Sequence, residues 1–341
     1  AGKHDRDFFE FEHWKPAEDD EHRIIETQQA VIDQLEEETW HDGPATWVIT
    51  SKLPWRDRHG NVKGTFGVSS DVTKLVNAQK QASDLAEQLL QKNQAYEEEL
   101  MLAREIQQAL AGEGFPATTS DRSHLNFGAR YIPISGLAGD FFEVMKVSDG
   151  CVGVLICDVM GHGVRSALIV AMLRGLLEKQ RAQALEPGLF LQGLNDGLTA
   201  ILERAGTTMF ATAFFGVIDL TADVFRYSCA GHPGPIIAGK DGVRQIANER
   251  RDKGPGLGLI KDATYPTHEL GLSEIDRMIL FTDGVLEAEN QKGEPFFENR
   301  LMEIIGLKTV EPMDKLLDGI LSSVLDFSES KQFDDDVCLL G

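Results

Sequence analysis

The first seventy residues contain short stretches in which apolar and polar positions alternate. Between positions 47 and 55 the apolar side chains all stand at odd positions: Trp47, Ile49, Leu53 and Trp55. A period of two is typical of a strand with one buried face, so this stretch predicts a half-buried strand. A turn and a second strand-like run at 62–68 follow it.

A long uninterrupted helix is predicted next. Residues 72–111 contain neither Gly nor Pro and are rich in Gln, Glu, Ala and Leu. A seven-residue apolar repeat, which includes Leu85 and Leu89, runs along this segment with two charged interruptions. We predict a coiled-coil linker helix over residues 74–112 that forms a parallel dimer. The alternative is one amphipathic helix packed on its own domain.

The remaining residues, 117–341, form the largest predicted unit. Its strand-like runs are 151–157, 209–218, 224–230, 278–281 and 337–340. Its helical runs are 164–185, 188–204 and 312–325. Two helices follow each other directly, and the strands run largely in succession. This order favours sheets covered by helices over alternating βαβ units.

Composition narrows the class of protein. The 341 residues include 33 basic and 55 acidic side chains, which gives a net charge of −22. Such a surface repels nucleic acid and anionic membranes, so we expect neither as a partner. Four scattered cysteines without a Cys-x-x-Cys pair indicate reduced thiols and a cytoplasmic protein. No run of about 18 apolar residues predicts a membrane span.

Four aspartates follow or precede strand-like runs in separate motifs: Asp140, Asp158, Asp283 and Asp335. Each motif alone is also explained as a turn or a helix cap, and residues 334–336 as a solvated acidic run. Two bare carboxylates about 4 Å apart repel by roughly 4 kcal/mol at an effective dielectric of ~20. If the fold gathers them, a hard cation such as Mg²⁺ or Mn²⁺ must lie between them.

Residues 1–73 resemble the C-terminal half of a PAS sensor domain. The shared features are Lys52-Leu53-Pro54, an Asp-x-x-Gly-Asn turn, Gly64-x-x-Gly67 and Asp71-Val72-Thr73. We therefore expect a partial PAS α/β domain whose first strands are missing, and we assign it no cofactor. The chain opens with Ala1 rather than Met, which indicates that an upstream segment has been removed.

The aspartate motifs together resemble the metal-dependent protein phosphatases (the PPM family), in the bacterial SpoIIE/RsbU-like branch. Further matches are Ala230-Gly231-His232-Pro233, Gly256-Leu257-Gly258-Leu259 and Thr282-Asp283-Gly284-Val285. One departure is Ala138-Gly139-Asp140, where the family usually has Gly-Gly-Asp. The resemblance implies an α+β protein whose phosphatase domain, over 117–341, is a β-sandwich flanked by helices (αββα).

The resemblance also implies a two-metal site for Mn²⁺ or Mg²⁺. Asp158 is expected to bridge the two ions and the carbonyl of Val159 to bind one of them. Asp140 is expected on one ion, and Asp283 with Asp335 on the other, with Asp336 as the alternative to Asp335. We expect Asp158 and Asp283 to be essential for catalysis.

Glu143 is a further candidate, either as a group that supports the metal ligands or as a ligand of a third metal ion. His162 is more simply explained as a structural or substrate-contacting residue than as a general acid, and His232 as a turn histidine. Neither needs a catalytic role.

The implied activity is hydrolysis of phosphoserine or phosphothreonine on a partner protein by a metal-activated water. In this branch the usual substrate is an anti-sigma-factor antagonist, and the homodimer formed through the linker is the implied regulator. Hydrolysis of a small-molecule phosphate is also open. The alternative to an enzyme is a catalytically silent signalling adaptor dimer. The loss of a metal-binding carboxylate would have favoured that alternative.

Overall fold

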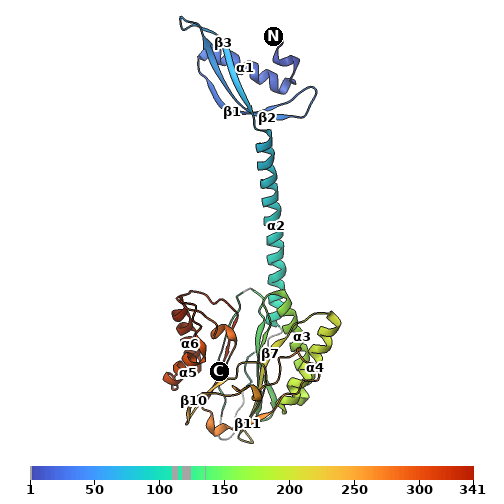
Figure 1. The fold of residues 1–341 in the computed structure, drawn as a ribbon, viewed down its shortest axis with the longest axis vertical. Coiled ribbons are helices and arrows are strands. Elements are labelled where there is room, and N and C mark those ends of the chain that lie inside the picture. Colours follow the sequence, from blue (N-terminus) through green and yellow to red (C-terminus); the bar gives the residue numbers. More distant parts are fainter. Residues whose placement is uncertain (1, 110–113, 117–123, 135) are drawn as a thin grey trace. The chain divides into compact units, whose positions relative to one another are not determined.

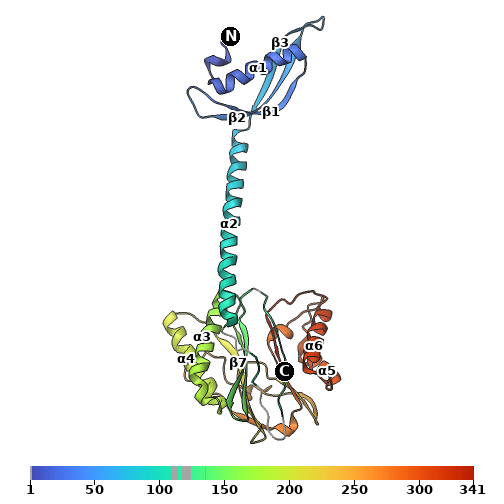
Figure 2. The same cartoon turned by 180° about the vertical axis from the view of Figure 1, so that it is seen from behind.

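The computed structural model describes residues 2–109, 114–116, 124–134 and 136–341. The chain divides into two compact units, Ala1–Glu97 and Glu98–Gly341. Figures 1 and 2 show the helices and strands of each unit from two sides. The division falls inside one long helix. The predicted end of the linker at 112 and the predicted domain start at 117 lie outside the described residues.

The smaller unit is a three-stranded antiparallel sheet with one helix on it. Its elements are α1 (Phe11–Thr27), β1 (Val31–Glu38), β2 (Thr46–Arg56) and β3 (Val62–Asp71), in the sheet order β1-β2-β3. The predicted strand is therefore present as β2. Its buried side chains are the even-numbered Val48, Thr50 and Lys52, which lie on the face that α1 covers. The odd-numbered face, which carries Trp55, is the more exposed one.

Helix α2 (Thr73–Ala109) confirms the predicted long helix. Large apolar side chains along it are exposed in the single chain, among them Leu75, Leu85, Leu89 and Tyr96. Exposure of so many apolar side chains is unusual for a helix packed on its own domain. None of the described helices combines the length and apolar character that a membrane span requires.

The larger unit is a β-sandwich of two five-stranded sheets. One sheet has the order β11-β8-β7-β6-β5 and the other β10-β9-β12-β13-β4. The strands are β4 (Ala129–Ile132), β5 (Asp140–Ser148), β6 (Cys151–Val159), β7 (Ala211–Asp219), β8 (Val224–Ala230), β9 (Ile236–Gly239), β10 (Gly242–Gln245), β11 (His268–Gly271), β12 (Arg277–Phe281) and β13 (Val337–Leu340).

Two pairs of helices cover the outer faces of the sandwich (Figure 1). Helices α3 (Val164–Gln180) and α4 (Pro187–Ala205) pack on the β5–β8 sheet. Helices α5 (Phe297–Leu307) and α6 (Met313–Ser328) pack on the other sheet. A third apolar core, which includes Phe214, Leu280 and Cys338, fills the space between the sheets. This is the αββα arrangement that the family resemblance implied.

Candidate active site

Two of the four aspartates face each other on neighbouring strands. Strands β5 and β6 form an antiparallel hairpin in which Asp140 pairs directly with Asp158. The sharp turn after Asp158 uses Gly161 and Gly163, whose φ angles of 80° and 86° are readily adopted only by glycine. Helix α3 begins immediately after that turn. The first sheet therefore ends with two carboxylates side by side.

The other sheet brings its aspartates to the same end of the sandwich. Asp283 follows β12, and Asp335 and Asp336 precede β13, the adjacent strand. A side chain on Gly284 would collide with the Asp336 carbonyl, so glycine is needed for the two segments to lie together. The Thr282 hydroxyl accepts a hydrogen bond from the Cys338 amide at 2.9 Å, which ties the residue before Asp283 to β13.

Burial and mutual repulsion raise the pKa values of Asp140, Asp158 and Asp283, and therefore favour the protonated forms of these carboxyl groups. The pKa of Asp140 is raised, first by burial and then by the charge of Asp158. Burial and the charge of Asp283 raise the pKa of Asp158. The pKa of Asp283 is also raised, by burial and then by the charges of Glu287 and Asp335. Strong shifts with named charge partners are typical of functional sites.

The structure gives different environments to Asp335 and Asp336, the two candidate metal ligands in the C-terminal motif. Both carboxylate oxygens of the buried Asp336 accept backbone hydrogen bonds, from Ile134 at 2.8 Å and from Gly139 at 3.0 Å. Asp336 therefore anchors the loop that leads into Asp140. The exposed Asp335 accepts only the amide of Asp336 in the part of the chain that is described. Asp335 is the freer of the two to bind a ligand.

We expect Asp336→Ala to lower the free energy of unfolding by roughly 2–4 kcal/mol, because two amides would lose a charged acceptor. Asp334→Ala, the exposed neighbour, should change it by less than about 0.5 kcal/mol. Urea unfolding of the two variants measures the difference. Equal midpoints for both variants would contradict the anchoring role.

The C-terminal turn of α2 contacts the same loop. The Gln107 side-chain amide donates to the Ala138 carbonyl at 2.8 Å, and its oxygen accepts the Ala138 amide at 3.3 Å. Ala138 is buried, and its φ is not positive, so the alanine that replaces the family's glycine does not strain the turn. Gly139 cannot be substituted as easily, because its Cβ would lie 2.9 Å from the carbonyl oxygens of Val159 and Gly161.

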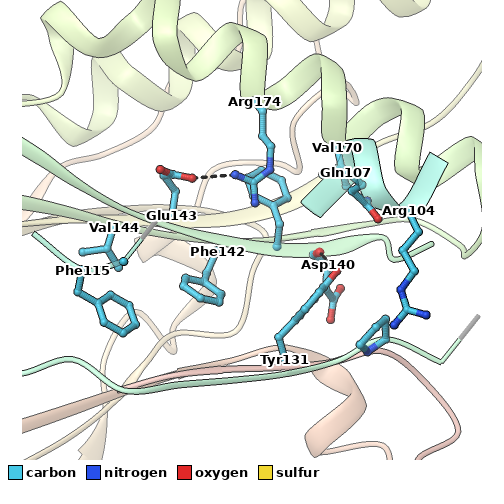
Figure 3. Close-up of a pocket in the computed structure, with 13 residues that line it drawn as sticks. Arg104, Gln107, Phe115, Tyr131, Asp140, Phe142, Glu143, Val144, Val170 and Arg174 are labelled. Atoms are coloured by element: carbon cyan, nitrogen blue, oxygen red, sulfur yellow. Dashed lines mark hydrogen bonds and ion pairs between the residues drawn. The ribbon is translucent and has the colours of Figure 1, made fainter. Parts of the chain in front are cut away.

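A cavity of about 470 Å³ opens beside Asp140 (Figure 3). Its walls come from α2, β4, β5 and α3, with Arg104 on the same side as Asp140. Glu143 lies on this wall but forms an ion pair with Arg174 at 2.8 Å. Residues 140 and 143 point to opposite faces of β5, so Glu143 is directed away from the other carboxylates.

The two histidines occupy different environments. His162 is exposed in the turn between β6 and α3. His232 is completely buried, and both ring nitrogens have hydrogen-bond partners. The expectation that His232 is a satisfied structural histidine agrees with this environment.

Sequence reasoning missed Gln107, Thr282 and Arg174. Gln107 is one of many polar residues on a helix, and Thr282 was noted only as part of a motif. No local signal in the sequence shows that either one contacts residues far away in the chain. The Arg174–Glu143 pair could have been found only by placing α3 against β5.

The carboxylate cluster fits a divalent cation by charge and by donor type. Asp140 Oδ2 is buried and has no hydrogen-bond partner among the described residues. All candidate ligands are oxygens, which Mg²⁺ and Mn²⁺ prefer. Within the described ranges, no three His, Cys, Asp or Glu side chains already lie in ligating geometry. The fit therefore rests on the unpaired oxygen and on the repulsion that a cation would relieve.

Comparison of the sequence with known proteins agrees with this architecture. Residues 148–341 match the family model of stage II sporulation protein E (SpoIIE), and residues 1–77 match a PAS fold. Phosphoserine phosphatase RsbP of Bacillus subtilis (strain 168) is 27% identical over 243 residues, which cover 71% of this chain and 57% of RsbP. Phosphoserine phosphatase RsbU of the same organism is 26% identical over 244 residues, which cover 71% of this chain and 69% of RsbU.

Solved structures show the same fold. The SiaA-PP2C domain of Pseudomonas aeruginosa has a TM-score of 0.61 at 16% identity and covers 73% of this chain and 97% of that domain. The PP2C phosphatase domain of Bacillus subtilis SpoIIE, with a fragment of its regulatory domain, has a TM-score of 0.51 at 15% identity, covering 96% of this chain and 89% of that one. The family model spans more than half of the chain, and the chain therefore belongs to the SpoIIE family, with a PAS fold at its N-terminus.

Proposed function

We propose that this chain is a metal-dependent protein phosphatase that acts on phosphoserine or phosphothreonine. The observation that carries the proposal is the pair formed by the buried Asp140 and the half-buried Asp158, two carboxylates in direct register with raised pKa values. Asp283 and Asp335 lie at the same end of the sandwich. The named activity of RsbP and RsbU, phosphoserine phosphatase, supports the same reaction.

The proposed metal ligands are Asp140, Asp158, the Val159 carbonyl, Asp283 and Asp335. When bound, two Mn²⁺ or Mg²⁺ ions would neutralise phosphoryl charge and lower the pKa of a water molecule. Asp158 would contact both ions, because it pairs directly with Asp140 and the charge of Asp283 acts on its carboxyl group. The ions would also offset the repulsion between a phosphate dianion and the four carboxylates.

The cavity beside Asp140 is the proposed approach for the phosphorylated segment. Arg104 supplies positive charge at the side of the cavity where Asp140 lies (Figure 3). The Tyr131 hydroxyl donates to the carbonyl oxygen of Asp140 at 3.1 Å and so joins the two strands, β4 and β5, that line the cavity there. Phe115 and Phe142 form an apolar side that would exclude water from a bound peptide.

The reaction is tested by hydrolysis of p-nitrophenyl phosphate and of a phosphoserine protein with Mn²⁺, with Mg²⁺ and with EDTA. Metal-dependent turnover that Asp158→Ala abolishes is the expected result. Folded, metal-loaded protein without turnover on either substrate would favour a silent adaptor or an enzyme held inactive until its signal arrives.

The linker is proposed to pair two chains. Its exposed apolar side chains, including Leu85 and Leu89, would be covered in a parallel coiled coil. Leu85→Asp combined with Leu89→Asp should therefore give a monomer in sedimentation, and it should change phosphatase activity without touching a metal ligand. A double variant that remained dimeric and fully active would contradict this role for α2.

The physiological substrate is proposed to be a phosphorylated anti-sigma-factor antagonist, the usual substrate in this branch of the family. A cytoplasmic location is consistent with four buried free thiols.

A further inference from the structure

His232 lies where the chain crosses from one sheet of the sandwich to the other. It follows β8 in the first sheet and precedes β9 in the second. Gly231 has a φ of 72° and makes the crossing turn possible. The Cys229 thiol donates to the His232 carbonyl at 3.1 Å and holds the crossing segment in place. The imidazole is completely buried between the sheets.

Each ring nitrogen contacts a different sheet. Nε2 lies 3.1 Å from the carbonyl oxygen of Phe281 on β12, and Nδ1 lies 2.7 Å from the hydroxyl oxygen of Thr212 on β7. A carbonyl can only accept, so Nε2 carries the hydrogen and Nδ1 accepts from Thr212. Burial lowers the pKa of His232 to about 3. The ring is therefore neutral in this one tautomer at every ordinary pH.

The two ends of this bridge lie next to the candidate metal ligands. Thr212 is the direct cross-strand partner of Asp158. Phe281 is two residues before Asp283. The Thr212–His232–Phe281 bridge therefore joins β7, which pairs with the strand of Asp158, to β12, the strand that Asp283 follows. Two further hydrogen bonds described above link the sheets at this end, from the Gly139 amide to Asp336 and from the Tyr131 hydroxyl to the Asp140 carbonyl, and both act on the segment around Asp140.

We propose that His232 is a positioning residue that fixes the spacing of Asp158 and Asp283, and through it the affinity of the two-metal site. The inference rests on the proposed function, because it concerns the affinity for the metal ions that Asp158 and Asp283 would bind there. Without the bridge the two sheets could move apart at this end, where repulsion between carboxylates already favours separation. Residues that orient metal ligands typically change metal affinity by about 10–100-fold.

The test compares Mn²⁺ affinity, by calorimetry on the full chain, with the free energy of unfolding in EDTA. Thr212→Val removes the hydroxyl with little change in shape and should raise the Mn²⁺ dissociation constant at least about tenfold. Ser228→Ala is the matched control, because Ser228 is a completely buried hydroxyl on β8 without a partner among the described residues. It should leave the dissociation constant within about twofold.

Two substitutions of the histidine complete the test. His232→Leu removes both hydrogen bonds and should weaken Mn²⁺ binding at least as much as Thr212→Val. His232→Gln keeps one donor and one acceptor and should recover part of the affinity. A core residue without a positioning role would change the free energy of unfolding in this series but not the affinity.

The outcomes separate this inference from the proposed function. If the wild type binds Mn²⁺ and Thr212→Val binds it equally well, the bridge has no role in metal binding and the inference is overturned. If the wild type binds no Mn²⁺, the metal site itself is wrong and the inference fails with it. Thr212→Val decides the question even if His232→Leu does not fold.

Discussion

Replacing Asp158 with asparagine is expected to reduce metal-dependent hydrolysis by at least about 100-fold while stabilising the metal-free protein. The first effect follows from the loss of a proposed bridging ligand. The second follows from the raised pKa of Asp158, which reflects burial and the nearby charge of Asp283. Asparagine fills the same space without a charge to bury.

The sign of the pH dependence follows from the same shift. A carboxyl group whose pKa is raised on folding keeps its proton in the native state over a pH range in which the unfolded chain has released it. Stability of the metal-free protein therefore falls as the pH rises above about 4, the ordinary pKa of an aspartate, and the loss continues up to the raised pKa. Asp158→Asn removes this contribution and should flatten the decline.

Urea unfolding in EDTA between pH 4.5 and pH 8 measures the effect, with the exposed Asp241→Asn as the control. A saturating Mn²⁺ concentration of about 100 times the dissociation constant should stabilise the wild type by roughly 2.7 kcal/mol and Asp158→Asn far less. Lower stability of Asp158→Asn in EDTA at pH 8, with the control unchanged, would contradict the raised pKa.

Gln107→Glu is expected to lower phosphatase activity by about tenfold or more. The substitution keeps the shape of the side chain but removes the donor that bonds the Ala138 carbonyl. It also places a negative charge against that carbonyl, two residues from Asp140. The loop before Asp140 would then be held by Asp336 and by the backbone bond between Val159 and Gly139.

The matched control is Gln94→Glu, an exposed glutamine on the same helix. It adds the same charge to α2 without touching the loop, so activity should stay close to that of the wild type. The Mn²⁺ concentration needed for half-maximal activity should rise in Gln107→Glu and not in Gln94→Glu. Equal behaviour of the two variants would show that α2 does not act on the site through Gln107.

The predicted fold was accurate where apolar runs were long or continuous. Strands β8 and β13 begin and end at the predicted residues, because each is mainly apolar and bounded by turn residues. Strands β4, β9, β10 and β11 were missed because none of these four-residue segments is a continuous run of large apolar residues like Val337–Leu340. The nine-residue β5 was missed because Glu143 and Lys146 interrupt its apolar side chains. In β2 the apolar side chains occupy the face that α1 leaves uncovered, and an alternating pattern cannot show which face a helix will cover.

Candidate ligands were recognised from motifs, but their supporting contacts were not. The motif around Asp335 left two candidates, and only the hydrogen bonds of Asp336 to Ile134 and Gly139 distinguish them. Those partners lie about two hundred positions earlier in the chain. Tertiary hydrogen bonds of this kind depend on how the sheets pack, which composition and periodicity do not encode locally.

The proposed function requires that the carboxylates at the end of the sandwich form a two-metal site. Calorimetric titration of the full chain with Mn²⁺ tests this claim most directly. We predict two ions bound per wild-type chain, and loss of both, or of all measurable affinity, in Asp158→Asn. Absence of binding to the wild type, or binding that Asp158→Asn leaves unchanged, would contradict it.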